Sequence, residues 1–384
     1  MKNFFKNKLI IFFKFFIKDK KFFFINPSYL GGLLNLIYLS AKSEKVKVIV
    51  DPKYIYKKNS FINKKIFLIA YEKLNNKKFN ILENLIYYIF FRLVRYTDEY
   101  KNFFVKAYVH GDAKVFEKMH NYNGITFDLN ENIKDKDIRD LVNRETLIFH
   151  CRDAEYKKIT SDINSSYHDY RNEDLTIYEQ AISKFKKKGN YSLVRFGSVG
   201  IKKCKNREIF DYTFSKSRSQ INDIHLIKNC KIYIGTGSGP DVLAMNFQKP
   251  IVFINWVHLP NLFTFQKNVV VIFKKIYSKS NNSFIKFDNL LSKNYLLSDK
   301  KTPVGLFYHS DQYKQSNLEL IHNSEDEIYH AVDEMINYVN GNFEFDENLQ
   351  NKFRSIYKKN MKNKINDKFF VSEYFIKKNL NLFN

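Results

Sequence analysis

The chain has 384 residues, of which 44% are hydrophobic, so it can build two ordinary domains with sizeable cores. Its net charge of +24 indicates either partners that carry negative charge or the lysine-rich composition of a protein from an AT-rich genome. The basic residues are spread along the chain without an RNP-like, zinc-finger or Arg-rich helical pattern, which argues against nucleic-acid binding. Three cysteines, none in a CxxC pair, exclude a disulfide framework and indicate the reducing cytoplasm.

Residues 1–21 form a basic segment rich in phenylalanine, and its apolar part, residues 9–17, is interrupted by Lys14. This stretch is too short to span a bilayer, and no small-residue cleavage site follows it. It fits either an interfacial helix on an anionic membrane or a helix packed on the domain. We therefore expect a cytoplasmic protein, either soluble or peripheral on the inner face of the cytoplasmic membrane.

Strands and helices alternate over residues 22–140, which predicts a Rossmann-like domain with a largely parallel sheet. The polar stretch 124–144 is interpreted as the boundary of this domain. The strands are predicted at residues 22–26, 46–50, 65–71 and 103–110, and the helices at residues 33–41, 80–96 and 113–120.

A second alternating series over residues 141–342 predicts another Rossmann-like domain, and residues 343–384 are expected to form a basic, helical tail. The predicted fold class is therefore α/β with two Rossmann-like domains and a C-terminal helical tail. In the second domain, strands are predicted at residues 146–150, 191–195, 210–214, 232–234, 251–254 and 269–273, and helices at residues 175–188, 217–228, 240–248 and 325–340.

Residues 230–255 have the pattern of a strand, a glycine turn, a helix and a second strand. The glycines let the backbone turn sharply and approach a ligand closely, and Ser238 with Asp241 has the spacing of a capping box. Unpaired N–H groups and the positive end of the helix dipole favour an anion there, most simply a phosphate. The alternative is a tight turn without a ligand. The candidate phosphate-binding residues of this turn are Gly235, Thr236, Gly237, Ser238, Gly239 and Asp241.

Three polar clusters follow strands of the second domain. Residues 150–156 contain Arg152, residues 168–172 contain Arg171, and Arg195 ends the next strand. If the strands are parallel, these clusters lie at the same carboxyl edge as the glycine turn, where such sheets bind ligands. Each arginine could grip a phosphate with two hydrogen bonds, or could instead form salt bridges within a loop.

No metal site is expected, because His150, His168 and Asp153 match no metal-ligand spacing and no Asp-x-Asp ends an apolar strand. A Walker A lysine motif and a full GxGxxG pattern are also missing, which argues against an NTPase and a dehydrogenase. The charge of a phosphorylated ligand would then be balanced by the helix dipole together with Arg152, Arg171 and one of Lys202 and Lys203.

Taken together, these residues resemble a bacterial family described as glycosyltransferases with a GT-B-like second domain. The glycine turn is also similar to the donor-site turn of heptosyltransferases and other GT-B enzymes. The segment after the first strand of this domain resembles the His-x-Arg motif of fucosyltransferases, without its second arginine and glycine. The resembling segments are residues 149–156, 168–172, 193–197, 233–241, 249–250 and 323–328.

The resemblance implies two Rossmann-like domains that face each other across a cleft, with a nucleotide sugar bound mainly by the second and a C-terminal helix that returns to the first. It implies transfer of the sugar to a surface polysaccharide or lipid-linked glycan, with no metal and no cofactor beyond the nucleotide sugar itself. Arg152 and Arg171 would offset charge on the leaving group, and Asp241, if it is not used up in capping, would meet ribose hydroxyls. The candidates for a general base are Asp153, His168 and His110, among which the sequence does not choose.

Two other functions remain open at this point. The chain could bind a nucleotide sugar or phosphoglycan at the membrane surface without catalysis, or it could be a nucleotide-sugar epimerase, which acts on the free donor.

Overall fold

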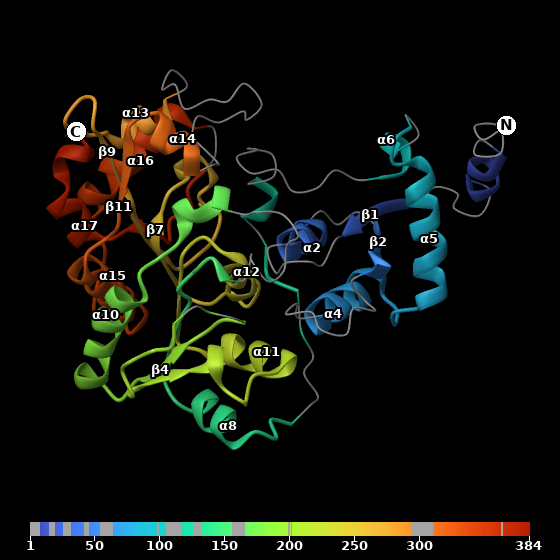
Figure 1. Ribbon diagram of the computed structural model, residues 1–384, viewed down its shortest axis with the longest axis horizontal. Coiled ribbons are helices and arrows are strands. Elements are labelled where there is room, and N and C mark those ends of the chain that lie inside the picture. Colours follow the sequence, from blue (N-terminus) through green and yellow to red (C-terminus); the bar gives the residue numbers. More distant parts are fainter. Residues whose placement is uncertain are drawn as a thin grey trace.

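The computed structural model shows an α/β protein, as the sequence predicts, with its two halves side by side (Figure 1). The residues that it describes are 8–14, 20–25, 32–41, 46–53, 64–97, 100–104, 117–120, 122–125, 127, 132–155, 166–198, 200, 202–292, 310–361 and 364–384. Within these ranges, no helix is both long enough and apolar enough to cross a membrane.

The second half is built on a seven-stranded sheet in which all neighbouring strands are parallel. In spatial order its strands are β12 (Phe369–Val371), β8 (Val269–Phe273), β7 (Ile251–Trp256), β6 (Ile232–Gly235), β3 (Thr146–Phe149), β4 (Ser192–Arg195) and β5 (Ile209–Asp211). From β3 the chain adds β4 and β5 on one side, and β6, β7 and β8 follow on the other. The strand order therefore reverses between β3 and β6, which is the position where open parallel sheets bind ligands.

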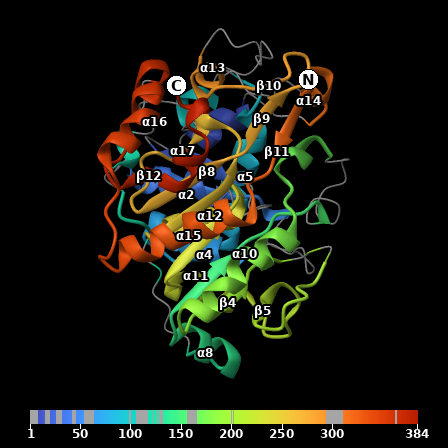
Figure 2. The same ribbon diagram turned by 90° about the vertical axis from the view of Figure 1, so that its left-hand side faces the viewer.

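Helices cover both faces of this sheet, which explains why its strands are almost entirely buried and read as unbroken apolar runs. Figure 2 looks onto the side of α10 (Leu175–Lys188) and α15 (Glu325–Val339), which pack against each other. The opposite face carries α11 (Gln220–Asn229) and α12 (Gly239–Asn246), which lie toward the first half in Figure 1.

The tail differs from the expected helical segment because it also contains a strand, β12. Its helices α16 (Glu347–Asn360) and α17 (Glu373–Lys378) flank β12, which pairs with β8 at the edge of the second sheet. The buried apolar side chains of β12 explain this placement, since the edge of β8 offers them both a core and backbone partners. The described tail reaches the first half where the His120 ring lies 3.3 Å from the Lys364 carbonyl oxygen.

In this half one strand prediction needs correction, and one sheet was not predicted. Residues 210–214 divide into the short strand β5 and a 3₁₀ turn at Tyr212–Phe214, where Tyr212 is fully buried. A small antiparallel sheet, which the sequence analysis does not predict, has its strands in the order β10 (Ser283–Phe284), β9 (Lys275–Ser278) and β11 (Leu318–Ile321).

In the first half, the described strands β1 (Lys21–Ile25) and β2 (Val46–Val50) form a parallel pair. Its helices are α2 (Leu33–Ala41), α4 (Lys64–Asn75), α5 (Ile81–Val94) and α6 (Tyr100–Phe103). The strand predicted at residues 65–71 is wrong, because this stretch belongs to α4. Its buried side chains follow the helical spacing of three and four residues, at Ile66, Phe67, Ala70 and Tyr71.

Other predictions for this half are tested only in part. Of the strand predicted at residues 103–110, Phe103 ends α6 and Phe104 forms an isolated bridge with Phe22. Residues 105–110 lie outside the described part of the chain, as do residues 113–116 of the predicted helix, whose residues 117–119 are helical.

The polar stretch 124–144 contains the helix α8 (Lys136–Val142), so its composition hides regular structure. Asp135 caps this helix by accepting a hydrogen bond from the Ile138 amide at 3.1 Å, and the Ile138 side chain is buried. The helix packs on α11. A charged surface with one inward apolar side chain is sufficient for a short capped helix.

The two halves are joined by a buried amide at the end of α12. The Asn246 side-chain oxygen accepts hydrogen bonds from the Tyr122 hydroxyl at 2.6 Å and the Ile125 amide at 2.9 Å. Its nitrogen donates to the Ile125 carbonyl at 3.1 Å. Asn246 is 2% exposed, so water cannot replace these partners.

We expect Asn246→Ala to lower the midpoint of thermal unfolding. The substitution removes all three hydrogen bonds and leaves the Ile125 amide and carbonyl without their side-chain partner, at a cost of about 1–3 kcal/mol for each group. Asn229→Ala is the matched control, because Asn229 is exposed at the end of α11. An equal midpoint for both variants would show that Asn246 does not hold the halves together.

Candidate anion-binding pocket

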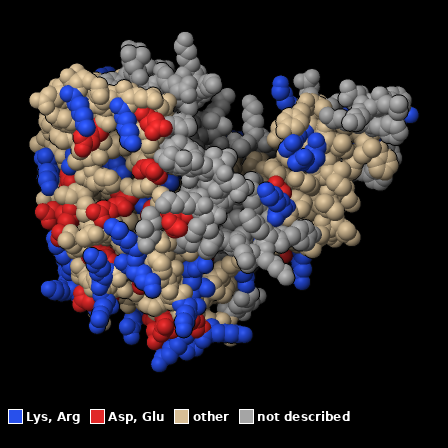
Figure 3. Space-filling view, viewed as in Figure 1, with Lys and Arg blue, Asp and Glu red and all other residues tan. Residues whose placement is uncertain are grey.

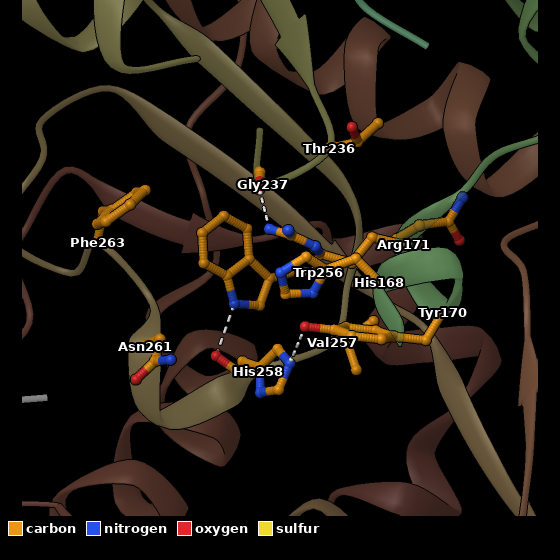
Figure 4. A pocket seen from close by; sticks show the side chains of 11 residues that line it. His168, Tyr170, Arg171, Thr236, Gly237, Trp256, Val257, His258, Asn261 and Phe263 are labelled. Carbon is orange, nitrogen blue, oxygen red and sulfur yellow. Dashed lines mark hydrogen bonds between the residues drawn. The ribbon is translucent and has the colours of Figure 1, made fainter. Parts of the chain in front are cut away.

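A pocket of about 200 Å³ opens beside the glycine turn, at the reversal point between β3 and β6. Its walls come from the segment after β6, the end of β7 with the loop that follows, and the 3₁₀ helix η2 (Ser166–Arg171) (Figure 4). The lining residues are His168, Tyr170, Arg171, Thr236, Gly237, Asn255, Trp256, Val257, His258, Asn261 and Phe263.

The glycine turn requires glycine at two positions for different reasons. A Cβ atom on Gly235 would lie 2.4 Å from Oδ1 of Asp241, which is too close for any side chain. Gly237 has a φ angle of +73°, and a Cβ there would be 3.4 Å from the Trp256 ring. At Gly237 the backbone of the turn therefore lines the pocket, and at Gly235 it packs directly against Asp241.

Asp241 lies inside the turn with none of its surface exposed, and it is used in capping, which was the alternative to a contact with ribose hydroxyls. Oδ2 accepts a hydrogen bond from the Ser238 amide at 2.6 Å, and Oδ1 accepts one from the Tyr233 hydroxyl at 3.0 Å. Burial raises the pKa of Asp241 to about 6. The carboxylate thus takes the Ser238 amide that the sequence analysis assigned to a bound anion, and Ser238 serves as the N-cap of α12.

Thr236 and Arg171 line the pocket, and each has a buried polar atom without a partner among the described residues. Thr236 is 3% exposed, and its Oγ1 has no hydrogen-bond partner among the described residues. Arg171 donates from Nη1 to the Gly237 carbonyl at 3.2 Å, drawn as a dashed line in Figure 4, and its buried Nε has no partner within the same residues. Leaving a buried polar group unpaired costs about 1–3 kcal/mol, so these two atoms are candidates for a hydrogen bond to a ligand.

The opposite wall of the pocket is aromatic and comes from residues that the sequence analysis did not select. Trp256 donates from Nε1 to the His258 carbonyl at 2.8 Å, and a His258 ring nitrogen lies 2.8 Å from the Tyr170 hydroxyl. Trp256 and His258 come directly after the strand predicted at residues 251–254. Their position at the carboxyl end of a buried strand is the signal that could have identified them.

Arg152 lies behind the pocket and holds η2 in place. It is 9% exposed, and its Nη1 donates to the His168 carbonyl at 3.1 Å and to the Asn172 side chain. Burial, followed by the nearby charge of Arg171, lowers the pKa of Arg152 to about 10. In this structure Arg152 orders the loop that carries His168 and Arg171, and it does not line the pocket.

Arg195 is engaged within the protein, which corrects the expectation that it binds a phosphate. Only 2% of it is exposed, and Nη1 donates to the Lys202 carbonyl at 2.5 Å and to Asp211 at 3.3 Å. Its Nη2 lies 3.8 Å from Asp153. Arg195 therefore forms salt bridges within the protein, which was the alternative to a phosphate contact. Neither Lys202 nor Lys203 lines the pocket.

The three candidates for a general base have different positions. His168 lines the pocket, with its ring 6.0 Å from that of Tyr170. Asp153 faces Arg195 outside the pocket, and His110 lies outside the described residues. The neighbouring His150 is buried, which lowers its pKa to about 4 and keeps the ring neutral at pH 7.

A buried ion pair, also missed by the sequence analysis, supports the floor of the pocket. Lys274 and Glu173 lie 3.1 Å apart, and each side chain is 1% exposed. Lys274 also donates to the Tyr170 carbonyl at 2.9 Å, and Asn255 donates to Glu173 at 2.5 Å. Lys274 directly follows the apolar strand β8, and a lysine at the carboxyl end of a buried strand is the signal that was available.

Among the described residues, no group of three or more His, Cys, Asp or Glu side chains is placed to hold a metal ion. Metal independence stays a prediction.

Comparison with known proteins found no matching family model and no matching curated protein. Among solved structures, the chain is similar to ADP-heptose LPS heptosyltransferase II of E. coli, with 13% identity, a TM-score of 0.35, and coverage of 66% of this chain and 90% of that one. A family 9 glycosyl transferase of Veillonella parvula matches with 13% identity and a TM-score of 0.39, over 67% of this chain and 86% of its own. The iron-containing dodecameric glycosyltransferase TibC of enterotoxigenic E. coli matches with 15% identity and a TM-score of 0.33, over 64% and 62%. All three are glycosyltransferases, the class that the sequence resembles.

The raised pKa of Asp241 predicts a pH dependence of stability. Between the ordinary value of 3.8 and the folded value of about 6, the folded state binds this proton more tightly than the unfolded state. Acidification from pH 7 to pH 4 should therefore stabilise the fold through this group, by up to about 3 kcal/mol.

The measurement compares thermal unfolding of the unsubstituted protein and Asp241→Asn across this pH range. Because the asparagine does not titrate, the difference between the two midpoints isolates Asp241. It should move in favour of the unsubstituted protein as the pH falls. A constant difference would mean that Asp241 is already ionised normally in the folded state.

Proposed function

We propose that the protein is a glycosyltransferase that moves a sugar from a nucleotide-sugar donor to a glycan acceptor. The observation that carries this proposal is the pair of buried polar atoms, Thr236 Oγ1 and Arg171 Nε, at a glycine turn on the reversal point of a parallel sheet. In this proposal the oxygens of a phosphate group pair with them, since such oxygens accept hydrogen bonds from a hydroxyl and from a guanidinium. The sequence resemblance to GT-B enzymes at the same turn supports this assignment.

In this proposal, Arg171 stabilises the negative charge that develops on the nucleoside diphosphate as the bond between the sugar and the phosphate oxygen breaks. The cation takes the part that a metal ion would otherwise play, so the transfer is metal-independent. The Trp256 and Tyr170 rings form an apolar wall for the rest of the donor. Arg152 acts through η2 by holding Arg171 in position.

An inverting transfer needs a base that takes the proton of the attacking acceptor hydroxyl. Of the candidates in the described part of the chain, His168 has the position for this role because it lines the pocket. The acceptor class that we propose is a surface polysaccharide or a lipid-linked glycan, made on the cytoplasmic side.

A binding protein without catalysis is the second candidate, and one observation favours it. Asp153 faces Arg195 and Asp241 is buried in the turn, so neither of these carboxylates is available to the pocket as a base. Slow hydrolysis of the donor in the absence of an acceptor distinguishes a transferase from a binding protein. Conversion of the free donor into another sugar would instead identify an epimerase.

Arg171→Ala should weaken donor binding by about 10- to 100-fold, because a charge-assisted hydrogen bond contributes about 1.5–3 kcal/mol. UDP-, GDP-, ADP- and CMP-sugars are first screened for the one that raises the thermal midpoint of the unsubstituted protein. The variant should lose both this shift and donor hydrolysis.

Arg139→Ala is the control for Arg171→Ala, since Arg139 is an exposed arginine on α8. Arg171→Lys keeps the charge without the planar fork and should recover only part of the affinity. Donor binding that persists in Arg171→Ala would remove the basis of the assignment.

We further propose that residues 2–21 bring the protein to an anionic membrane. The helical residues 8–14 bury Ile10 and place Phe13 against Phe90, with ring centroids 5.7 Å apart, yet they leave three large apolar side chains exposed at Leu9, Ile11 and Phe12. The segment therefore has both a packed side and a side suited to an interface.

Deletion of residues 2–21 should move the protein from the membrane fraction to the soluble fraction. The shift should be more complete at high salt, because salt also screens the remaining basic residues from anionic lipids. The thermal midpoint of the shortened protein checks that the loss of Ile10 has not unfolded it. An unchanged distribution between the fractions would rule out this role.

A further inference from the structure

The helix α5 has an apolar face that no described residue covers. Five large aliphatic side chains on it are exposed by more than two fifths: Ile81 49%, Leu82 72%, Leu85 42%, Ile86 50% and Ile89 43%. They recur at spacings of three, four and one residue, so they lie on one side of the helix, and Tyr96 continues this side beyond its end. We call this surface the α5 face.

The other side of α5 is fully used in packing. Tyr87, Phe90, Phe91 and Val94 belong to an aromatic core that also contains Phe22 of β1. A helix that is apolar all round is normally buried on every side or inserted in lipid. With 14 residues α5 is about 21 Å long, too short to span a bilayer, so its outer side is suited to lie in an interface.

Basic residues outnumber acidic ones around the α5 face. Lys78 and Arg92 are exposed at its two ends, and Arg95 stacks on the Tyr96 ring at 4.3 Å. Glu83 is the acidic residue of α5, and it pairs with Lys77. Figure 3 shows this half as a largely tan surface with a few blue side chains and little red, whereas the second half carries many of both colours.

We infer that the α5 face docks on an anionic membrane, with its aliphatic side chains among the acyl chains and Lys78, Arg92 and Arg95 at the phosphate groups. An apolar stripe bordered by cations matches the layers of an anionic leaflet, in which hydrocarbon lies beneath negative headgroups. Residues 8–14 pack on the same aromatic core through Ile10 and Phe13, so both elements bring exposed apolar side chains to one part of the molecule. This inference concerns attachment and does not depend on the chemistry of the pocket.

The test uses the full chain and vesicles made of equal parts of phosphatidylcholine and phosphatidylglycerol. The double variant Leu82→Glu, Ile86→Glu should reduce the vesicle-bound fraction in sedimentation by about tenfold or more, because it places two charges in the apolar layer. Phe284→Glu is the control, since Phe284 is 40% exposed on the second half, and it should bind vesicles like the unsubstituted protein. The donor-induced thermal shift should be equal in all three proteins, which separates this result from the proposed transferase activity.

A second variant tests insertion without adding charge. The tryptophan of Leu85→Trp should shift its emission to shorter wavelength when these vesicles are added, and less with phosphatidylcholine alone. An unchanged emission, or full vesicle binding by the double glutamate variant, would overturn the inference. A dimer in gel filtration that the glutamate variant disperses would also overturn it, because the α5 face would then be covered by a second copy of the chain.

Discussion

The pocket depends on one buried carboxylate. Asp241 sits beneath the glycine turn, where it accepts hydrogen bonds from the Ser238 amide and the Tyr233 hydroxyl and leaves no space for a side chain on Gly235. These bonds fix the end of β6 to the start of α12. Thr236 and Gly237 of the turn line the pocket, and the Gly237 carbonyl accepts a hydrogen bond from Arg171 of η2. The protein thus satisfies the helix N-terminus with its own anion.

A second set of contacts brings the other walls to this turn. Arg152 holds η2 through the His168 carbonyl, and Lys274 holds it through the Tyr170 carbonyl. Glu173 offsets the buried charge of Lys274 and accepts a hydrogen bond from Asn255 at the end of β7. Buried charges of this kind are costly to separate, so the loops at the carboxyl edge share one fixed arrangement. Because these loops are already ordered, binding of a ligand would cost little conformational entropy.

The sequence pattern was informative where one physical cause dominates. The buried strands of the second sheet are unbroken apolar runs, so the strand at residues 269–273 was predicted with its observed bounds. The pattern failed where the run is short and ambiguous: residues 65–71 suit a strand equally well until α4 places Ile66 and Ala70 on the same buried side. The same limit applies to the site. Arg195 ends a strand and Arg171 ends a polar loop segment, and the sequence alone gives both the same possible role. Only the fold decides that Arg195 meets Asp211 while Arg171 meets the pocket.

The edge strand β12 has a consequence for how the protein is made. Its residues pair with β8 across a separation of 100 residues in the chain, from Val269 to Phe369. During synthesis, β8 is therefore released with one edge open until the tail emerges, and an open apolar strand edge is a template for pairing with other chains. The last strand of the sheet therefore covers the β8 edge only at the end of synthesis.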